Sequence, residues 1–241
     1  MTGALYRCPI IRCVPLSNAR EHAQPVQEIV LEAPPGFSFR AGQYTQVEHL
    51  EGLIPLSIAS GPRRLPTVTL HYRSLPGVPA ARWMDELLAA GEALLLHAPA
   101  GDVQMPDDSR QPIVMIVGGT GITQALAVLD ELADVSERAP VDLLWCADSA
   151  DDFYCRHALD ALAASWLRVR YTVDPRRTPD NSAFEQARNL LSSSRTAAPW
   201  ILLGGSPSFV YAMDEALATV TRTPRHADAF SWAPRPTQQD L

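Results

Sequence analysis

The second half of the chain alternates short apolar runs with segments of helical periodicity, and this alternation limits the possible folds more than any other feature. The apolar runs lie at 113–117, 141–146, 167–173 and 200–203, and the helical segments lie at 122–132, 152–164, 183–191 and 208–220. Strand–helix repeats of this kind predict a parallel sheet with right-handed crossovers. Ligands of such sheets bind at the carboxyl ends of the strands.

The first half has a different texture. Its apolar stretches are short, rich in Val, Ile, Leu and Thr, and separated by Pro and Gly, which is typical of an antiparallel β-barrel. The predicted strands are 6–14, 25–32, 44–49, 55–60, 67–72 and 93–97, with one helix at 80–90. Because a polar, Pro-containing stretch at 105–112 separates the two textures, we predict a β-barrel domain at 1–104, an α/β domain at 110–235 and a flexible tail at 236–241.

The charged residues exclude several kinds of chemistry. All 20 basic residues of the 241 are Arg, so a Schiff-base lysine and the lysine of a phosphate-binding P-loop are both excluded. A net charge of −7 carries no basic footprint for nucleic acid or for an anionic membrane surface. The N-terminus lacks the apolar core of a signal peptide and no apolar run approaches a membrane span, so we expect a cytoplasmic protein.

The potential metal ligands are scattered. Cys8, Cys13, Cys146 and Cys155 show neither a disulfide framework nor paired zinc spacing, and we expect free thiols. Four of the six histidines, His22, His49, His97 and His157, have no partner at metal spacing, so we expect no metal site. No cysteine cluster follows the α/β half, which argues against an iron–sulfur domain.

Two glycine turns mark the predicted nucleotide crevice. Gly118, Gly119, Thr120 and Gly121 follow the first predicted parallel strand and precede a helix, and a second turn, Gly204, Gly205, Ser206 and Pro207, has the same context. Glycines allow close approach of a pyrophosphate, and a helix N-terminus offers N–H groups and the positive end of its dipole. Because Gln124 replaces the third Gly of the Rossmann fingerprint, the general motif is not satisfied.

The ordered motifs FRAGQY, PLSIAS, VGGTGIT, GGSP and DAF resemble those of the NAD(P)H:flavin oxidoreductases, in the ferredoxin–NADP⁺ reductase-like group. The resemblance extends from about Phe39 to Trp232, and it implies a flavin-binding type of β-barrel at 1–104 and an NAD(P)-binding α/β domain at 110–235. It implies hydride transfer from NADH or NADPH to FAD, FMN or riboflavin, with reduced flavin passing to an acceptor such as a monooxygenase or a ferric complex.

The resemblance also implies roles for particular residues. Ser57 would lie near flavin N5 as the catalytic residue, and the residues around it would form the adjacent wall: Pro55, Leu56, Ile58 and Ala59. Gly118 to Gly121 would receive the nicotinamide nucleotide and Gly204 to Pro207 would close the opposite side. Phe230, in Asp228-Ala229-Phe230, would close the flavin or nicotinamide side.

Two positions depart from the family pattern. Ile54 stands where the family has an Arg that anchors the flavin, which predicts weak flavin binding; Arg63, Arg64 or Arg73 are candidates to compensate. His71 alternates with Arg73 on a predicted strand, and we count both as candidate cofactor contacts. Asp148 stands where the family often has an Arg for the NADPH 2′-phosphate, so its carboxylate predicts a preference for NADH.

Three hypotheses therefore remain open. The chain is a reductase that releases reduced flavin, a reductase subunit that keeps its flavin and passes electrons to a partner protein, or a catalytically degenerate relative that still binds a nucleotide. The chain's own residues do not decide the preferred flavin, the acceptor or the oligomeric state.

Overall fold

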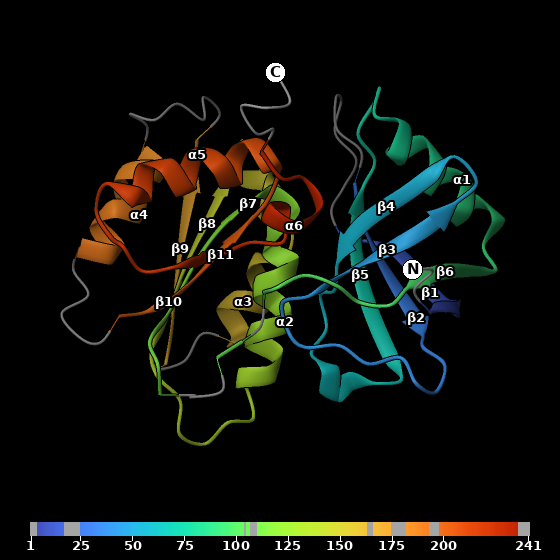
Figure 1. Ribbon diagram of the computed structural model, residues 1–241, viewed down its shortest axis with the longest axis horizontal. Coiled ribbons are helices and arrows are strands. Elements are labelled where there is room, and N and C mark those ends of the chain that lie inside the picture. Colours follow the sequence, from blue (N-terminus) through green and yellow to red (C-terminus); the bar gives the residue numbers. More distant parts are fainter. Residues whose placement is uncertain are drawn as a thin grey trace.

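The computed structural model describes residues 4–16, 25–103, 105–106, 110–162, 166–174, 182–192 and 198–235. Two lobes lie side by side, an antiparallel sheet from the first half of the chain and a parallel sheet flanked by helices from the second half (Figure 1). This is the predicted fold class. The predicted tail at 236–241 lies outside the described residues. None of the helices in the described part combines the length and apolar character needed to cross a membrane.

The antiparallel sheet has the strand order β4-β3-β6-β1-β2-β5. It closes toward a barrel because Ile58 bridges to Leu70 and the Ala59 amide donates to the Thr69 carbonyl at 2.8 Å. Inside it, alternate side chains of each strand form an apolar core, against which Met84 of α1 (Pro79–Ala90) is fully buried. The strands are β1 (Leu5–Pro15), β2 (Val26–Glu32), β3 (Tyr44–His49), β4 (Gly52–Ser57), β5 (Thr67–Arg73) and β6 (Ala93–His97).

The parallel sheet has the order β11-β10-β7-β8-β9. Successive side chains of β7 face opposite sides, so Met115 and Val117 enter the core beneath α2, whereas Val114 and Ile116 pack toward α4 and α5. The strands are β7 (Ile113–Gly118), β8 (Val141–Ala147), β9 (Leu167–Val173), β10 (Trp200–Gly204) and β11 (Arg225–His226). The helices are α2 (Ile122–Leu132), α3 (Arg156–Leu162), α4 (Ser182–Ser192), α5 (Pro207–Ala218) and α6 (Ala229–Trp232).

Two predicted elements differ from the structure by three residues or more at one or both ends, whereas the bounds of the others agree to within two residues. The strand predicted at 55–60 is β4, which begins earlier, at Gly52, because it forms a hairpin with β3 in which His49 pairs with Gly52. Pro55 is tolerated there because β4 is an edge strand and needs no second ladder of amide donors. The helix predicted at 152–164 is interrupted: a short 3₁₀ turn, η3 (Ala150–Asp152), is closed by a capping box between Ser149 and Asp152, and α3 starts at Arg156.

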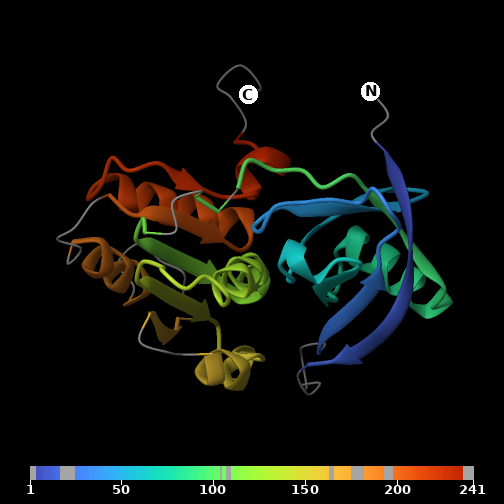
Figure 2. The ribbon, with the colours of Figure 1, turned by 90° about the horizontal axis from the view of Figure 1, so that it is seen from below.

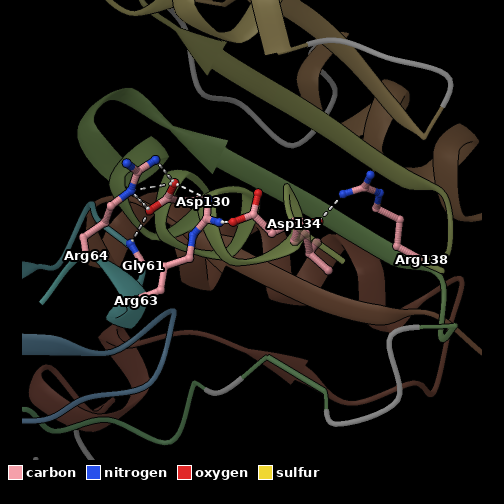
Figure 3. A network of polar contacts seen from close by, with 7 residues as sticks. Gly61, Arg63, Arg64, Asp130, Asp134 and Arg138 are labelled. Atoms are coloured by element: carbon pink, nitrogen blue, oxygen red, sulfur yellow. Dashed lines mark hydrogen bonds and ion pairs between the residues drawn. The ribbon is translucent and has the colours of Figure 1, made fainter. Parts of the chain in front are cut away.

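An arginine and aspartate cluster joins the two lobes on one side. A 3₁₀ turn of the barrel, η1 (Pro62–Arg64), meets α2, which lies between the parallel sheet and the barrel (Figure 2). Asp130 of α2 accepts hydrogen bonds from the Gly61 amide at 2.9 Å, from Arg63 and from Arg64, and Arg63 also pairs with Asp134 (Figure 3). Although burial alone raises the pKa of Asp130, the hydrogen bonds from Arg64, Gly61 and Arg63 lower it to about 2.

Candidate functional site

A cavity of about 470 Å³ lies between the lobes. The barrel contributes Pro55, Leu56 and Ser57 of β4 with His71 and Arg73 of β5. The opposite wall comes from both glycine turns, which supply Thr120, Gly121, Gly205, Ser206 and Pro207. The β4 segment and the two turns are therefore brought to one site from distant parts of the chain.

A second cavity of about 300 Å³ adjoins the first along the carboxyl ends of β7 and β8. Both cavities are lined by Arg73, Leu75, Thr120 and Ser206, which mark their junction. Gly118, Gly119 and Asp148 line the second cavity, at the sheet edge where parallel α/β sheets bind ligands. Asp174 and Asp152, which the sequence analysis did not select, line it as well.

The two glycine turns pack backbone against backbone. A Cβ on Gly121 would lie 2.2 Å from the Gly205 amide nitrogen, and a Cβ on Gly204 would lie 2.7 Å from the Gly121 carbonyl oxygen. No side chain fits at either position without displacing main chain. Gly119 has a φ of +54°, in the left-handed region that favours glycine. The glycines thus shape the crevice as well as line it.

Two side chains that the sequence analysis did not select hold this crevice in place. The Trp145 indole N–H of β8 donates to the Gly119 carbonyl at 3.0 Å. Gln124, which occupies the place of the missing third glycine, donates its amide to the Gly42 carbonyl of the barrel at 2.9 Å and is 2% exposed. The departure from the Rossmann fingerprint therefore provides a contact between the lobes.

Ser57 ends β4 and meets an acidic residue from the C-terminal segment. The Ser57 hydroxyl donates to Asp228 Oδ2 at 3.4 Å, at the long end of hydrogen-bond geometry, and both residues line the larger cavity. Asp228 is 2% exposed, and its other oxygen, Oδ1, has no hydrogen-bond partner among the described residues. A buried carboxyl in such surroundings is costly to ionise.

The electrostatic surroundings of Asp228 favour its neutral form. Burial raises the pKa of Asp228 to about 8, the Ser57 hydrogen bond opposes this shift, and the charge of Asp102 adds to it. Gly101 runs against the carboxyl, since a Cβ there would lie 2.7 Å from Asp228 Oδ1. At neutral pH the site therefore contains a protonated carboxyl beside the Ser57 hydroxyl.

His71 and Arg73 bind across the gap between the lobes. The Arg73 Nη1 lies 3.0 Å from Asp152 Oδ1, and the His71 Nδ1 lies 3.1 Å from the Tyr154 hydroxyl. Burial lowers the pKa of His71 to about 4, so its imidazole is neutral at physiological pH. Both side chains line the cavity while they join β5 to the segment after β8.

The remaining selected residues lie as follows. Ile54 is 4% exposed and belongs to the barrel core, although its edge reaches the cavity. Ile58 and Ala59 are buried behind β4, where their amides donate to the carbonyls of Gln43 and Thr69, and neither lines either of the two cavities.

Phe230 and the candidate arginines lie elsewhere. The Phe230 ring centroid lies 5.4 Å from that of Tyr211, on the α5 side, and Trp232 lines the larger cavity instead. Arg63 and Arg64 bond to Asp130, so Arg73 is the only one of the three candidate arginines at either cavity.

The residues present suit a planar, largely apolar ring system beside a dinucleotide. The larger cavity has the size of a small-molecule site, its barrel wall is mostly apolar, and the orphaned Asp228 Oδ1 lies at its edge. The glycine turns supply a cradle that a Cβ would fill, at the start of a helix. Flavin and nicotinamide rings fit this donor set, whereas Ile54 provides no charge for a flavin phosphate.

Comparison with known proteins agrees with this geometry. Residues 115–214 match the oxidoreductase NAD-binding domain family. The chain is 27% identical over 204 residues to the terephthalate 1,2-dioxygenase reductase component 1 of Comamonas sp., covering 81% of this chain and 60% of that protein. It is 27% identical over 150 residues to a probable flavin reductase of Photobacterium leiognathi, covering 61% of this chain and 64% of that one. The chain thus spans less than two thirds of the length of these relatives.

Solved structures share the whole architecture. The H286L mutant of ferredoxin–NADP⁺ reductase from Plasmodium falciparum, with 2′P-AMP, superposes with a TM-score of 0.76 at 12% identity, covering 92% of this chain and 95% of that one. The Amycolatopsis cytochrome P450 reductase GcoB superposes with a TM-score of 0.73 at 21% identity, covering 95% and 71%. At these identities the likeness shows the fold.

Proposed function

We propose that the chain, which shares its fold with ferredoxin–NADP⁺ reductase and contains an oxidoreductase NAD-binding domain, is an NAD(P)H-dependent flavin reductase. One observation carries the proposal: a single cavity brings the β4 segment ending at Ser57 against both glycine turns. In the proposed reaction, hydride passes from nicotinamide C4 to flavin N5. The reduced flavin then leaves for an acceptor, for which the oxygenase systems named among the relatives suggest a monooxygenase or dioxygenase.

The protein's contribution is positioning and exclusion of water. Pro55 and Leu56 form an apolar wall against which a flavin ring would lie, and the turn at Gly205 to Pro207 faces that wall. The mostly apolar surroundings keep water from the reacting faces of the two rings. The turn at Gly118 to Gly121 would receive the dinucleotide phosphates at the start of α2.

Ser57 and Asp228 together form the polar edge of the proposed hydride-transfer site. Because burial raises the pKa of Asp228 to about 8, this carboxyl carries a proton at neutral pH. A neutral Asp228 adds no negative charge beside a ring that is gaining electrons. When protonated, Asp228 can donate to the Ser57 oxygen, which leaves the Ser57 hydroxyl hydrogen to donate toward the ring. Ser57 is therefore the proposed catalytic residue and Asp228 its positioning partner.

The proposed nicotinamide donor is NADH. The smaller cavity is lined by three carboxylates, from Asp148, Asp152 and Asp174, and its only cation among the described residues is Arg73. A 2′-phosphate would add about −1.5 to −2 charges to this acidic surface, whereas a free ribose hydroxyl would find an acceptor at Asp148. We expect a higher kcat/KM with NADH than with NADPH. We also expect the ratio of these two kcat/KM values to be smaller in Asp148→Arg than in wild type. A wild-type preference for NADPH would overturn this assignment.

The test of the proposed reaction is anaerobic oxidation of NADH with added riboflavin, FMN or FAD, after the absorbance spectrum of the purified protein has been recorded. Turnover that requires added flavin supports the proposal. Ser57→Ala should lower kcat by about tenfold or more with little effect on NADH affinity, since it removes a group next to the reacting atoms. Absence of NADH oxidation with all three flavins would contradict the proposed function.

A second candidate is a reductase component that keeps its flavin and passes electrons to a partner protein. The names of the relatives favour it, because several are reductase or electron transfer components of oxygenases. Burial of Ile54 in the barrel core argues against it, since no cation replaces the missing flavin anchor at that position. A purified protein that is yellow, with about one flavin per chain, would favour this candidate; a colourless protein that reduces added flavin favours the first.

A further inference from the structure

Among the described residues, one arginine lies at the junction of the two cavities, and it already forms an ion pair. Arg73 lines both cavities, and no other Arg does so among the described residues. Its Nη1 lies 3.0 Å from Asp152 Oδ1, and the two side chains are only 19% and 10% exposed. Its Nε is buried and has no hydrogen-bond partner in the described part of the chain, so the guanidinium is held at the junction with donor capacity left over.

Asp152 is held in place by its own loop. Its Oδ2 accepts hydrogen bonds from the Ser149 amide and the Ser149 hydroxyl, both at 3.1 Å, which close the capping box of η3. The remaining oxygen, Oδ1, is left to face Arg73. The ion pair thus joins a strand of the barrel to a preorganised turn of the other lobe, and it does not depend on flexible surface side chains.

Away from the N–H groups of the glycine turn, the charge around this pair disfavours a phosphate group. Asp148, Asp152 and Asp174 line the smaller cavity, against the single charge of Arg73. A flavin phosphate near the junction would bring about two further negative charges toward an arginine whose charge Asp152 already compensates. A flavin without phosphate would meet no such cost.

We propose that the Arg73–Asp152 ion pair sets the flavin specificity of this protein by cancelling the positive charge of Arg73 at the junction, so that phosphate-free flavin is accepted at least as well as FMN. The inference rests on the proposed function and deepens it. It assigns to Asp152 a role in specificity: replacing Asp152 by an uncharged residue would leave Arg73 able to attract phosphate. The flavin is the relevant partner because Arg73 projects from β5 of the barrel, whereas the glycine turn provides helix N–H groups for the dinucleotide.

The experiment compares the ratio of kcat/KM for FMN to that for riboflavin in wild type, Asp152→Asn, Arg73→Met and the double variant. We expect a wild-type ratio of one or below, and a rise of about threefold or more in Asp152→Asn. Arg73→Met should not raise the ratio, and adding it to Asp152→Asn should remove the rise. A double-mutant cycle of this kind isolates the contribution of the pair.

Two control variants separate charge from structure. Ser149→Ala weakens the same capping box but leaves the carboxylate of Asp152, so its ratio should remain that of wild type. Asp142→Asn removes an acidic partner of Arg168 on β8 and β9, away from both cavities, and should also leave the ratio unchanged. Circular dichroism and a thermal melt show whether each variant is folded.

Equilibrium binding keeps this inference separate from the proposed reaction. Quenching of riboflavin and FMN fluorescence yields a ratio of Kd values even if no NADH is oxidised. If no protein oxidises NADH but the Kd ratio changes in Asp152→Asn, the result would contradict the proposed flavin reduction and still support the role of the ion pair in flavin specificity. An unchanged FMN to riboflavin ratio in folded Asp152→Asn would overturn the inference, as would a wild type that prefers FMN tenfold. The inference would also fail if Asp152→Asn changed only the preference between NADH and reduced nicotinamide riboside, because the pair would then act on the nicotinamide donor and not on the flavin.

Discussion

The Ser57 hydroxyl donates to Asp228 Oδ2 at 3.4 Å, although 171 positions of sequence separate the two residues. One ends a strand of the barrel, and the other lies beyond the last strand of the parallel sheet. Their contact requires the C-terminal segment to return across the gap between the lobes. The pair is therefore a sensitive indicator that the lobes are correctly assembled.

The pH dependence of stability should report on Asp228. Its folded pKa of about 8 lies above its ordinary value of 3.8, so the folded state binds the proton more tightly than the unfolded state. The contribution is complete below about pH 4 and is lost as the pH rises through about 8. We expect the Tm of wild type to fall between pH 6 and 9 more steeply than that of Asp228→Asn. Parallel Tm curves for the two proteins would show that the carboxyl is ionised throughout.

Asp130 should behave in the opposite way. Its pKa of about 2 lies below the ordinary value, so its contribution to stability is present above about pH 4 and is lost as the pH falls toward 2. Asp130→Ala removes the acceptor of three donors from the barrel and should lower the free energy of unfolding by about 1–3 kcal/mol in a urea titration at pH 7.

The matched control for Asp130 is Asp134, which lies four residues further along the chain and has a side chain that is 76% exposed. It pairs with Arg63 alone among the described residues, so Asp134→Ala should cost less than about 0.5 kcal/mol. Equal losses for the two variants would mean that burial and the Gly61 amide contribute nothing to the Asp130 cluster.

Gly121 should tolerate no side chain. A Cβ in Gly121→Ala would lie 2.2 Å from the Gly205 nitrogen and 2.6 Å from the Gly204 oxygen, both main-chain atoms. We expect a loss of about 3 kcal/mol or more in stability, with weakened NADH binding, because one glycine turn must move. Gly77→Ala has open space around its Cβ and should cost only its backbone strain at a φ of +81°, about 1 kcal/mol. Similar denaturation midpoints for the two variants would refute the packing of the turns.

Trp145 should affect nucleotide binding through the glycine turn. Trp145→Phe keeps an aromatic ring in the core but removes the donor to the Gly119 carbonyl. We expect about a threefold to tenfold weaker Kd for NADH, with FMN binding unchanged, because only the nucleotide side of the site is loosened. Isothermal titration with NADH and with FMN measures the two effects, and an equal weakening of both would indicate a general loss of core packing.

Local sequence patterns predicted most of the elements because their causes are local. Strands 44–49 and 93–97 and the helix 122–132 have the observed bounds, since apolar periodicity and flanking turn residues determine them. The helix predicted at 152–164 was wrong at its start because the capping box at Ser149 closes a separate turn first. The short elements β11 and α6 were not predicted, because they have too few residues to show a period.

The sequence by itself determined the two kinds of sheet, the glycine turns and the segment that ends at Ser57, because periodicity, glycine content and chain order are properties of neighbouring residues. Only the tertiary structure decided which charges meet: Ser57 with Asp228, Arg73 with Asp152 and Asp130 with Arg64. Each pair joins segments more than 60 positions apart. Burial and charge pairing at such distances depend on how the lobes pack, and no local pattern records that.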